Sequence, residues 1–151
     1  MIEAVRALYR SLIAGWNAGD AVAMTAGFAD EAHMIGFDGS EITGRDRARE
    51  YLASIFADHK VASFVTLVRD VHEIAPGVAL LHAHAGMLPP GQSAINRATN
   101  AVQTLVAVKH DGAWRSVLFQ NTRSAWHGRE DDVKRITAEL QAEADYLARF
   151  V

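Results

Sequence analysis

The sequence predicts an α+β fold in which a strongly curved antiparallel sheet wraps around N-terminal helices, with an extra helix at the C-terminus. Helical hydrophobic periodicity dominates residues 1–60, a period of two runs through residues 61–123, and the helical period returns after residue 128. Helices on either side of a run of antiparallel strands pack against the sheet that those strands form. Such a sheet leaves an open-ended cone, whose interior is a natural place for an apolar pocket.

Three helices and one hairpin are predicted before residue 61. Apolar side chains recur every three or four residues in the helical segments, and Asp20 is placed to cap the second helix. Asp38 and Gly39 are typical of a tight turn, with alternating residues before it and Glu41–Thr43 returning after it. The helices are expected over residues 2–15, 21–29 and 46–60, and the hairpin lies between the second and the third.

The rest of the chain predicts a meander of long antiparallel strands followed by a helix. The strand segments are rich in β-branched residues, and Pro76-Gly77 and Asp111-Gly112 supply two hairpin turns. The strands are expected over residues 61–74, 78–88, 99–110 and 113–123, a loop over 89–98 and the last helix over 129–150. Since 151 residues usually form one domain, residues 1–127 are expected to form the cone and residues 128–151 a helix of that same domain.

Composition argues against several classes of function. The formal charge of −3 gives no positive field for nucleic acid, and the absence of cysteine excludes disulfides and thiolate chemistry. The first helix carries charged residues at helical intervals and no segment approaches a membrane span, which predicts a cytoplasmic protein without membrane partners. No G-x-G-x-x-G stretch supports NAD binding, and we expect no cofactor.

Three short motifs occur in order in the first third of the chain: WNAGD at residues 16–20, FADEA at residues 28–32 and GSEITGR at residues 39–45. Their order and spacing resemble the opening of the nuclear-transport-factor-2-like superfamily, which includes ketosteroid isomerase and the SnoaL-like polyketide cyclases. Residues 75–96 and 100–129 resemble a narrower branch, the SgcJ/EcaC-like proteins associated with bacterial secondary metabolism.

This resemblance covers residues 3–130 and implies a cystatin-like, ketosteroid isomerase-like cone, commonly a homodimer packed through the sheet. It implies no particular reaction, because the superfamily contains both enzymes and non-catalytic binding domains. Aligned without gaps, the general base of the isomerase falls on Gly36, and its two oxyanion-stabilising groups fall near Leu12 and Val106. Steroid isomerisation by that route is therefore disfavoured, and Asp38 is the nearest carboxylate.

The end of the last predicted strand is unusually polar for a strand that begins with apolar residues. Alternation places Val117, Phe119, Asn121 and Arg123 on one face, and the resemblance implies that this face looks into the cone. Asn121 would then offer a ligand both a donor and an acceptor, while Phe119 supplies apolar wall. The alternative is that these polar side chains only satisfy backbone groups at the end of the sheet.

His82 and His84 form a His-x-His pair on one face of a predicted strand. One interpretation is a general acid or base in the pocket, because the pKa of histidine lies near neutrality. A second is a metal site, which needs a third ligand that nothing in the sequence places nearby, so no metal is predicted. The third interpretation is a pair of hydrogen-bonded histidines at a subunit face.

Candidate ligand contacts are apolar or aromatic side chains expected to face the cone. Trp16 and Tyr51 each combine a ring with a polar group, whereas most other aromatic residues are expected to form the core. The loop over residues 87–97 is apolar at its start, which favours a lid or a dimer contact. The predicted ligand-binding residues are Trp16, Met34, Tyr51, Phe119 and Arg123.

Together these features predict a protein that binds a small aromatic or polyketide-like metabolite. An enzyme of this kind would use cofactor-free acid–base chemistry, as a cyclase, isomerase, dehydratase or hydrolase. His84, His82 or Asp38 would then carry the proton, and Asn121 would orient the substrate or stabilise an oxyanion. The alternatives are a non-catalytic ligand-binding dimer and an assembly domain whose cone is filled by its own side chains.

Overall fold

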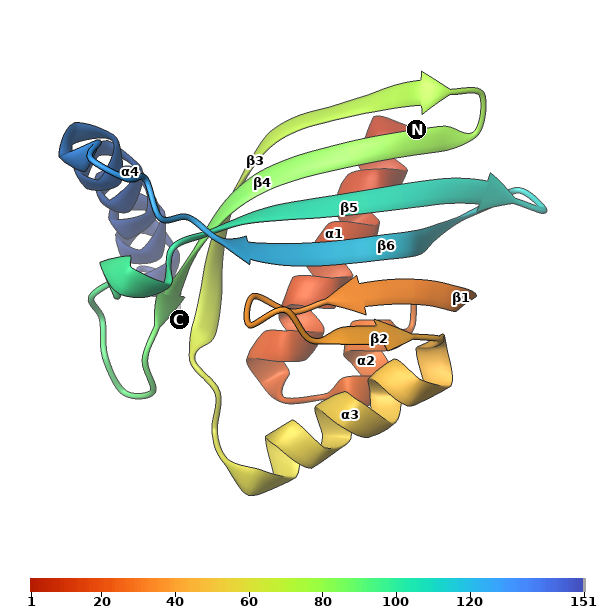
Figure 1. Cartoon of the computed structure of the whole chain (residues 1–151), viewed down its shortest axis with the longest axis horizontal. Helices are drawn as coiled ribbons and strands as arrows, with labels where there is room; N and C mark the ends of the chain where they lie inside the picture. The colour runs from red at the N-terminus through yellow and green to blue at the C-terminus, as the bar shows by residue number, and fades with distance from the viewer. Residues whose placement is uncertain (151) are drawn as a thin grey trace.

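A computed structural model describes residues 1–150 and shows a curved six-stranded sheet with three helices on its concave face and a fourth near one end (Figure 1). The elements are α1 (Ile2–Ala18), α2 (Ala21–Thr25), β1 (Phe28–Ile35), β2 (Glu41–Thr43), α3 (Arg45–Asp58), β3 (Ser63–Ala75), β4 (Val78–Leu88), η1 (Arg97–Thr99), β5 (Ala101–His110), β6 (Ala113–Arg123) and α4 (Glu130–Ala148). None of the helices in residues 1–150 is both long and apolar enough to cross a membrane.

The strand order β2-β1-β6-β5-β4-β3 confirms the predicted fold class, a curved and mainly antiparallel sheet that leaves its two edge strands unjoined. Strands β3 to β6 form the predicted meander, and the β1–β2 hairpin is also confirmed. Strand β1 joins β6 in parallel, so the hairpin extends the same sheet rather than forming a second one. The first half of the chain therefore supplies both the helices of the cone and one side of its wall.

Helix α1 is longer than predicted, because Gly15 does not end it. A Cβ atom at Gly15 would lie 2.3 Å from the backbone nitrogen of Met24, so the glycine allows α2 to approach α1 closely. The helix ends instead at Gly19, which adopts a left-handed conformation with φ 64° and donates its N–H to the carbonyl of Trp16.

Helix α2 is shorter than the helix predicted over residues 21–29. Asp20 caps α2 as expected, accepting a hydrogen bond from the backbone N–H of Ala23 at 3.0 Å. The helix stops at Thr25, however, and Phe28 begins β1, where it is paired with Ser116 of β6. Long-range strand pairing thus overrides the local helical pattern at this point.

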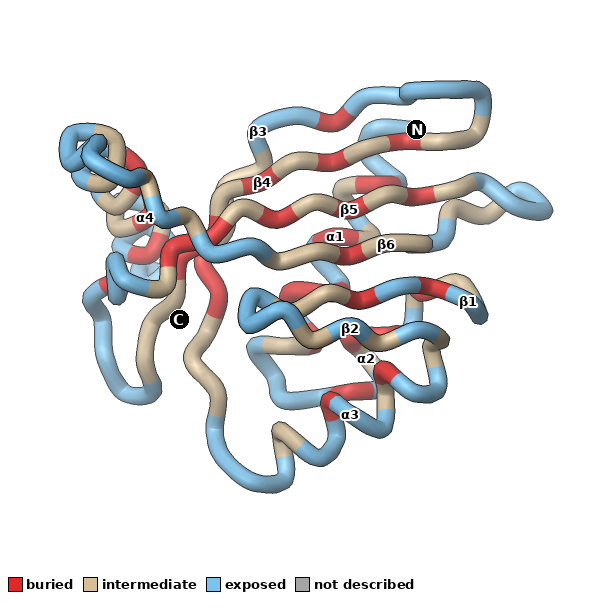
Figure 2. The backbone as a smooth tube through the Cα atoms, in the orientation of Figure 1, coloured by how far each residue is buried: buried red, intermediate tan, exposed pale blue. Residues whose placement is uncertain are grey.

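Alternation along the central strands separates a concave from a convex face of the sheet. On β4 the residues Ala79, Leu81, Ala83 and Ala85 are fully buried against the helices, and the residues between them are half-buried (Figure 2). Strand β6 has a bulge, since Val106 pairs with Leu118 but Ala107 pairs with Ser116. The bulge turns Ser116 toward the core, so the predicted inward position of Val117 is wrong, whereas Phe119 is buried as expected.

Helix α4 packs on the convex face, where it covers the ends of β3 and β4. Its buried residues Ile136, Leu140 and Ala144 form a separate cluster with Val65 of β3 and Ile95 of the loop after β4. A Cβ atom at Gly86 would lie 3.0 Å from Leu140 Cδ1, so this glycine lets the helix approach the sheet. The last predicted residue of this segment, Val151, lies outside the described residues.

Candidate ligand-binding site

A pocket of about 320 Å³ lies in the cone between the three N-terminal helices and the concave face of the sheet. Its wall is formed by α1, α2, the β1–β2 hairpin with its turn, α3, residues 59–62, η1 and parts of β3, β4 and β6. Small-molecule pockets usually measure roughly 300–1,000 Å³, so this volume suits a small ligand.

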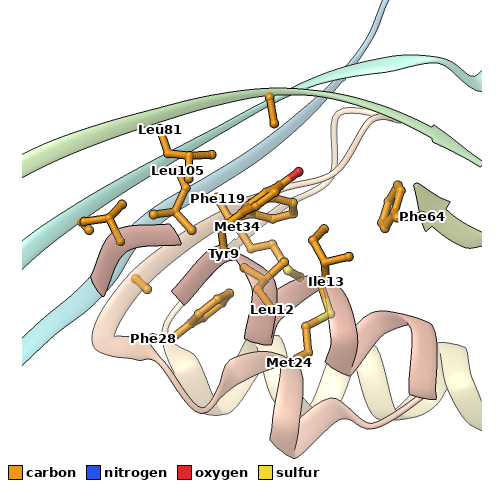
Figure 3. Packing of buried hydrophobic residues seen from close by; sticks show 14 of the residues in the cluster. Tyr9, Leu12, Ile13, Met24, Phe28, Met34, Phe64, Leu81, Leu105 and Phe119 are labelled. Carbon is orange, nitrogen blue, oxygen red and sulfur yellow. The ribbon is translucent and has the colours of Figure 1, made fainter. Parts of the chain in front are cut away.

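Most of the pocket wall is apolar or aromatic. Trp16 packs edge-on against Phe56 at a ring distance of 5.4 Å and lies 5.2 Å from the ring of Phe64. The indole N–H of Trp16 donates to the carbonyl of Ala62 at 2.8 Å, which fixes the ring against the segment that leads into β3. Figure 3 shows Phe64, Met34 and Phe119 around the space between α1 and the sheet.

The structure brings together six of the nine residues singled out from the sequence. Asp38 and Asn121 of the predicted catalytic set line the pocket, and so do four of the predicted ligand contacts. Those four are Trp16, Met34, Tyr51 and Phe119. The chemical roles assigned to all six residues stay predictions.

His82 and His84 do not line the pocket, so the structure does not bring them together with Asp38 and Asn121. They alternate with the buried Ala83 and therefore project from the convex face of β4. Their rings are 5.5 Å apart. Within residues 1–150 no group of three His, Asp or Glu side chains is arranged to hold a metal ion.

His84 belongs instead to a polar network under α4. Its Nδ1 accepts a hydrogen bond from Nε of Arg69 at 2.9 Å, and Arg69 also forms an ion pair with Glu139 at 2.7 Å. Burial, followed by the charges of Arg69 and His82, lowers the pKa of His84 below its ordinary value of 6.5. His84 is therefore a neutral hydrogen-bond acceptor at neutral pH in this position.

Arg123, the remaining predicted ligand contact, turns away from the pocket. Its Nε donates to the backbone carbonyl of Ala98 at 2.8 Å, which ties the end of β6 to η1. The side chain borders a separate groove with Trp126 and Arg129, where the Arg129 guanidinium lies 4.8 Å from the centre of the indole ring. Alternation placed Arg123 on the same face as Asn121. The strand ends at Arg123, however, and its side chain bonds the carbonyl of Ala98 instead of entering the pocket.

The loop after β4 is fastened to α4. The backbone N–H of Ile95 donates to Oε1 of Gln141, and Nε2 of the same glutamine donates to the carbonyl of Ser93. Met87, at the start of the region predicted to be a lid or dimer contact, lines the pocket, while Ile95 is buried under the helix. The loop thus connects the pocket wall to the C-terminal helix.

Asp38 lies in the turn between β1 and β2, on the pocket wall. Its Oδ1 accepts a hydrogen bond from the backbone N–H of Ser40 at 2.9 Å. Hydrogen bonds from the backbone and side chain of Ser40 lower the pKa of Asp38. Among the described residues Asp38 is the only carboxylate on the pocket wall, and it is ionised at neutral pH.

Asn121 is the polar group that β6 contributes to the pocket, and a buried side chain behind the pocket wall hydrogen-bonds it. Its Oδ1 accepts a hydrogen bond from Nε2 of Gln103 at 3.2 Å. Gln103 Oε1 in turn accepts from the hydroxyl of Tyr9 at 2.5 Å, and both of these side chains are almost completely buried. Burial raises the pKa of Tyr9, so its hydroxyl keeps its proton.

Sequence reasoning missed Gln103, Tyr9 and two rim residues, His59 and Lys60. The signal for Gln103 was present, because it shares its strand face with Leu105 and is therefore an amide on an apolar surface. Its pairing with Tyr9 spans 94 residues and leaves no local pattern. His59 and Lys60 are exposed in the segment that follows α3, where they border the pocket.

Solved structures of similar fold come from several bacteria. A domain of unknown function with a cystatin-like fold from Nostoc punctiforme is 26% identical, with 97% of this chain and 93% of that chain covered and a TM-score of 0.78. An uncharacterised cystatin-like protein from Caulobacter vibrioides is 22% identical over 89% and 97% of the two chains, with a TM-score of 0.69. A ketosteroid isomerase-like protein from Erwinia carotovora atroseptica is 15% identical over 82% and 95%, with a TM-score of 0.64.

The likenesses below 25% identity carry the fold alone, and the Nostoc domain has no stated function. No curated protein matches the chain. The narrower SgcJ/EcaC-like branch stays a prediction. A family model for the SnoaL-like domain matches residues 5–121, which run from α1 into β6 and include every residue that lines the pocket, and the chain therefore belongs to the SnoaL-like family.

Proposed function

We propose that this protein binds a small, mostly apolar organic molecule, of an aromatic or polyketide-like kind, in the pocket of the cone. The observation that carries the proposal is the pocket itself, whose apolar and aromatic wall is interrupted by a few polar groups such as Asn121 and Thr99. An apolar wall supplies affinity, and a few fixed polar groups supply orientation. A place in secondary metabolism is the corresponding biological proposal.

Binding is tested by looking for a retained ligand and by narrowing the pocket. Mass spectrometry of the purified protein after denaturation should release a small aromatic or polyketide-like molecule. Ile42 lines the pocket and is half-buried, so Ile42→Phe should reduce ligand retention. The matched control is Ile74→Phe at a 53% exposed position on β3, which should retain ligand as the wild type does. Equal retention in the two variants would place the ligand elsewhere.

A second candidate is cofactor-free acid–base chemistry in the same pocket, which the presence of Asp38 on its wall favours. The carboxylate would accept a proton from a carbon next to a carbonyl group, and Asn121 would hydrogen-bond the resulting enolate oxygen. Its lowered pKa makes Asp38 a weak base, so a slow reaction or an acidic substrate is expected. His82 and His84 have no role in this proposed reaction, because they lie on the convex face of the sheet.

Proton abstraction has a direct test with 1-indanone, a bicyclic ketone with exchangeable hydrogens next to its carbonyl. In heavy water, the wild type should exchange these hydrogens for deuterium faster than buffer does, as followed by NMR. Asp38→Asn should return the rate to that of buffer. Exchange at the buffer rate with wild-type protein would remove this candidate and leave the binding proposal standing.

We also propose that two copies of the chain pack through the convex face of the sheet. This face carries half-buried apolar side chains on β4, β5 and β6 that do not belong to the cluster packed under α4. They include Leu80, Val106 and Leu118, which are neighbours in the strand register. Figure 1 shows α4 beside one end of the sheet. Light scattering should give a dimer for the wild type and a monomer for Val106→Glu, whereas Val22→Glu, at a 58% exposed position on α2, should leave the dimer intact.

A further inference from the structure

Behind the pocket wall, three side chains form a continuous chain of hydrogen bonds from α1 to β6. The Tyr9 hydroxyl donates to Gln103 Oε1, and Gln103 Nε2 donates to Asn121 Oδ1. Tyr9 is 1% exposed and Gln103 is fully buried, whereas Asn121 is half-buried and lines the pocket. The chain therefore has a buried beginning and an end that faces a ligand.

Each hydrogen bond in this chain determines the orientation of the next group. A side-chain amide has an acceptor at one end and donors at the other, so a partner that binds its oxygen directs its nitrogen the opposite way. The proton that Tyr9 donates fixes the oxygen of Gln103, and the nitrogen of Gln103 then fixes the oxygen of Asn121. The remaining group, Nδ2 of Asn121, is left to the pocket as a donor.

The surroundings of Tyr9 keep this chain in place. Figure 3 shows its hydroxyl oxygen, the only red atom on a labelled side chain, among buried apolar residues between α1 and the sheet. Burial raises the pKa of Tyr9, and the side chain of Thr66 offsets only part of this effect. A phenol that stays neutral remains a donor throughout the physiological pH range, and a buried amide left without its partner is costly.

We propose that Tyr9 and Gln103 are positioning residues that make Asn121 present an N–H donor, so that the pocket selects ligands carrying a hydrogen-bond acceptor such as a ketone or quinone carbonyl. This inference rests on the proposed function, because it assumes that the pocket binds a ligand. It adds the class of ligand and the residues that set the selection. A ligand with only a donor at this point would face the N–H group of Asn121 and leave its own donor unpaired.

Two bicyclic probes of the same size separate donor from acceptor: 1-indanone, whose carbonyl only accepts, and indole, whose N–H only donates. In NMR titrations the wild type should bind 1-indanone about tenfold more tightly than indole, as expected for one hydrogen bond made or lost. The double variant Tyr9→Phe/Gln103→Met removes both members of the buried hydrogen-bonded pair together and should fold, because neither is left buried without the other and the half-buried Asn121 can turn toward the pocket. Asn121 is then free to turn, and the preference should fall to about twofold or less.

The matched control is Tyr146→Phe/Gln92→Met, the same two replacements at exposed positions outside the pocket, which should keep the wild-type preference. Asn121→Leu should also abolish the preference, because it removes the donor itself. A wild type that prefers indole, or a Tyr9→Phe/Gln103→Met variant that keeps the full preference for 1-indanone, would overturn the inference.

A measurement without ligand separates this inference from the proposed function. In the free protein, the Asn121 side-chain NH₂ protons should exchange rapidly with water, since they face the pocket. If the chain ran in the opposite direction, Gln103 would accept a hydrogen bond from Asn121 and slow this exchange. Slow exchange therefore overturns the inferred direction, whereas rapid exchange with no binding of either probe would count against the proposed function alone.

Discussion

The concave and convex faces of the sheet use the same strands but hold different kinds of polar groups. On the concave face, Gln103 and Tyr9 are uncharged, almost fully buried and hydrogen-bonded to each other. On the convex face, Arg69, His84 and Glu139 are charged or titratable and partly exposed under α4. The two faces of the sheet thus hold polar groups in different environments, one buried and neutral and the other partly exposed and ionic.

The two faces therefore differ in the interactions that hold their polar groups. Packing and directed hydrogen bonds dominate on the concave face, and charge dominates on the convex face. A buried neutral network is insensitive to salt, and its loss is felt through unpaired groups and cavities. A partly exposed ionic network is screened by salt and responds to pH. The concave face should therefore govern global stability and ligand choice, and the convex face should tune the docking of α4.

The largest expected effect is on the concave face, at Leu105 of β5. This side chain is completely buried in the main cluster, and Leu105→Ala should lower the free energy of unfolding by about 3 to 4 kcal/mol. Urea denaturation followed by circular dichroism measures this change. The control Leu147→Ala removes the same atoms from a 46% exposed position on α4 and should change stability by less than about 0.5 kcal/mol. Similar values for the two variants would contradict the assignment of the main core.

The corresponding change on the convex face is Leu140→Ala. Leu140 is equally buried, but it belongs to the smaller cluster, where α4 can settle toward the sheet and close part of the cavity. The expected loss is about 2 to 3 kcal/mol, smaller than for Leu105→Ala. Because this helix does not line the pocket, the relative affinity for 1-indanone and indole should stay at the wild-type value. A changed ratio would show that the two faces are coupled.

The sequence predicted the arrangement of the two faces better than the limits of the helices. The change of hydrophobic period is a local signal, and it is enough to order the elements. Alternation put Phe119 and Asn121 on one face, and the family resemblance was needed to point that face into the cone, where both side chains line the pocket. The lengths of α1 and α2 depend instead on contacts from elsewhere, at Gly15 against Met24 and at Phe28 beside β6. Local propensity carries no information on such contacts.

The same contrast holds for the candidate site. The face of His82 and His84 was encoded in the sequence, since the alternate residues of β4 are an apolar series that must face the core. Gln103 was detectable as an amide on an apolar strand face, but its bond to Tyr9 was not. Arg123 turns away from the pocket because it bonds the carbonyl of Ala98, 25 residues earlier in the chain. The two residues come together only in the folded structure, so no local pattern predicts this contact.

A pH-dependent effect is expected on the convex face. The folded state lowers the pKa of His84 through burial and then through the charges of Arg69 and His82, with Glu139 opposing and Arg135 adding to the decrease. The unfolded chain therefore binds a proton more readily, and stability falls as the pH drops through 6.5, the ordinary pKa of histidine. His84→Gln removes this proton uptake while keeping an acceptor for Arg69, so the loss of stability between about pH 7.5 and pH 5.5 should be smaller than in the wild type.

Urea denaturation at the two pH values measures this difference. The control Thr122→Ser changes a non-titrating side chain on the same face of the sheet and should keep the wild-type pH dependence. An unchanged pH dependence in His84→Gln would mean that the environment of His84 does not resist protonation.

The smallest expected effect is at the ion pair that links α4 to the sheet. Glu139 contacts Arg69 at 2.7 Å and Arg135 at 3.2 Å, and its side chain is 36% exposed. Glu139→Gln should lower the free energy of unfolding by less than about 1 kcal/mol, and the difference should nearly vanish in about 1 M salt, where charges are screened within a few ångströms. The charge of Glu139 also opposes the burial that lowers the pKa of His84, so the variant should lower that pKa further in an NMR titration. Glu73→Gln, at an exposed glutamate on β3, is the control and should leave the titration of His84 unchanged. A loss that persists at high salt would mean that Glu139 acts through hydrogen bonds and packing, as the concave face does, and would remove the distinction between the two faces at this point.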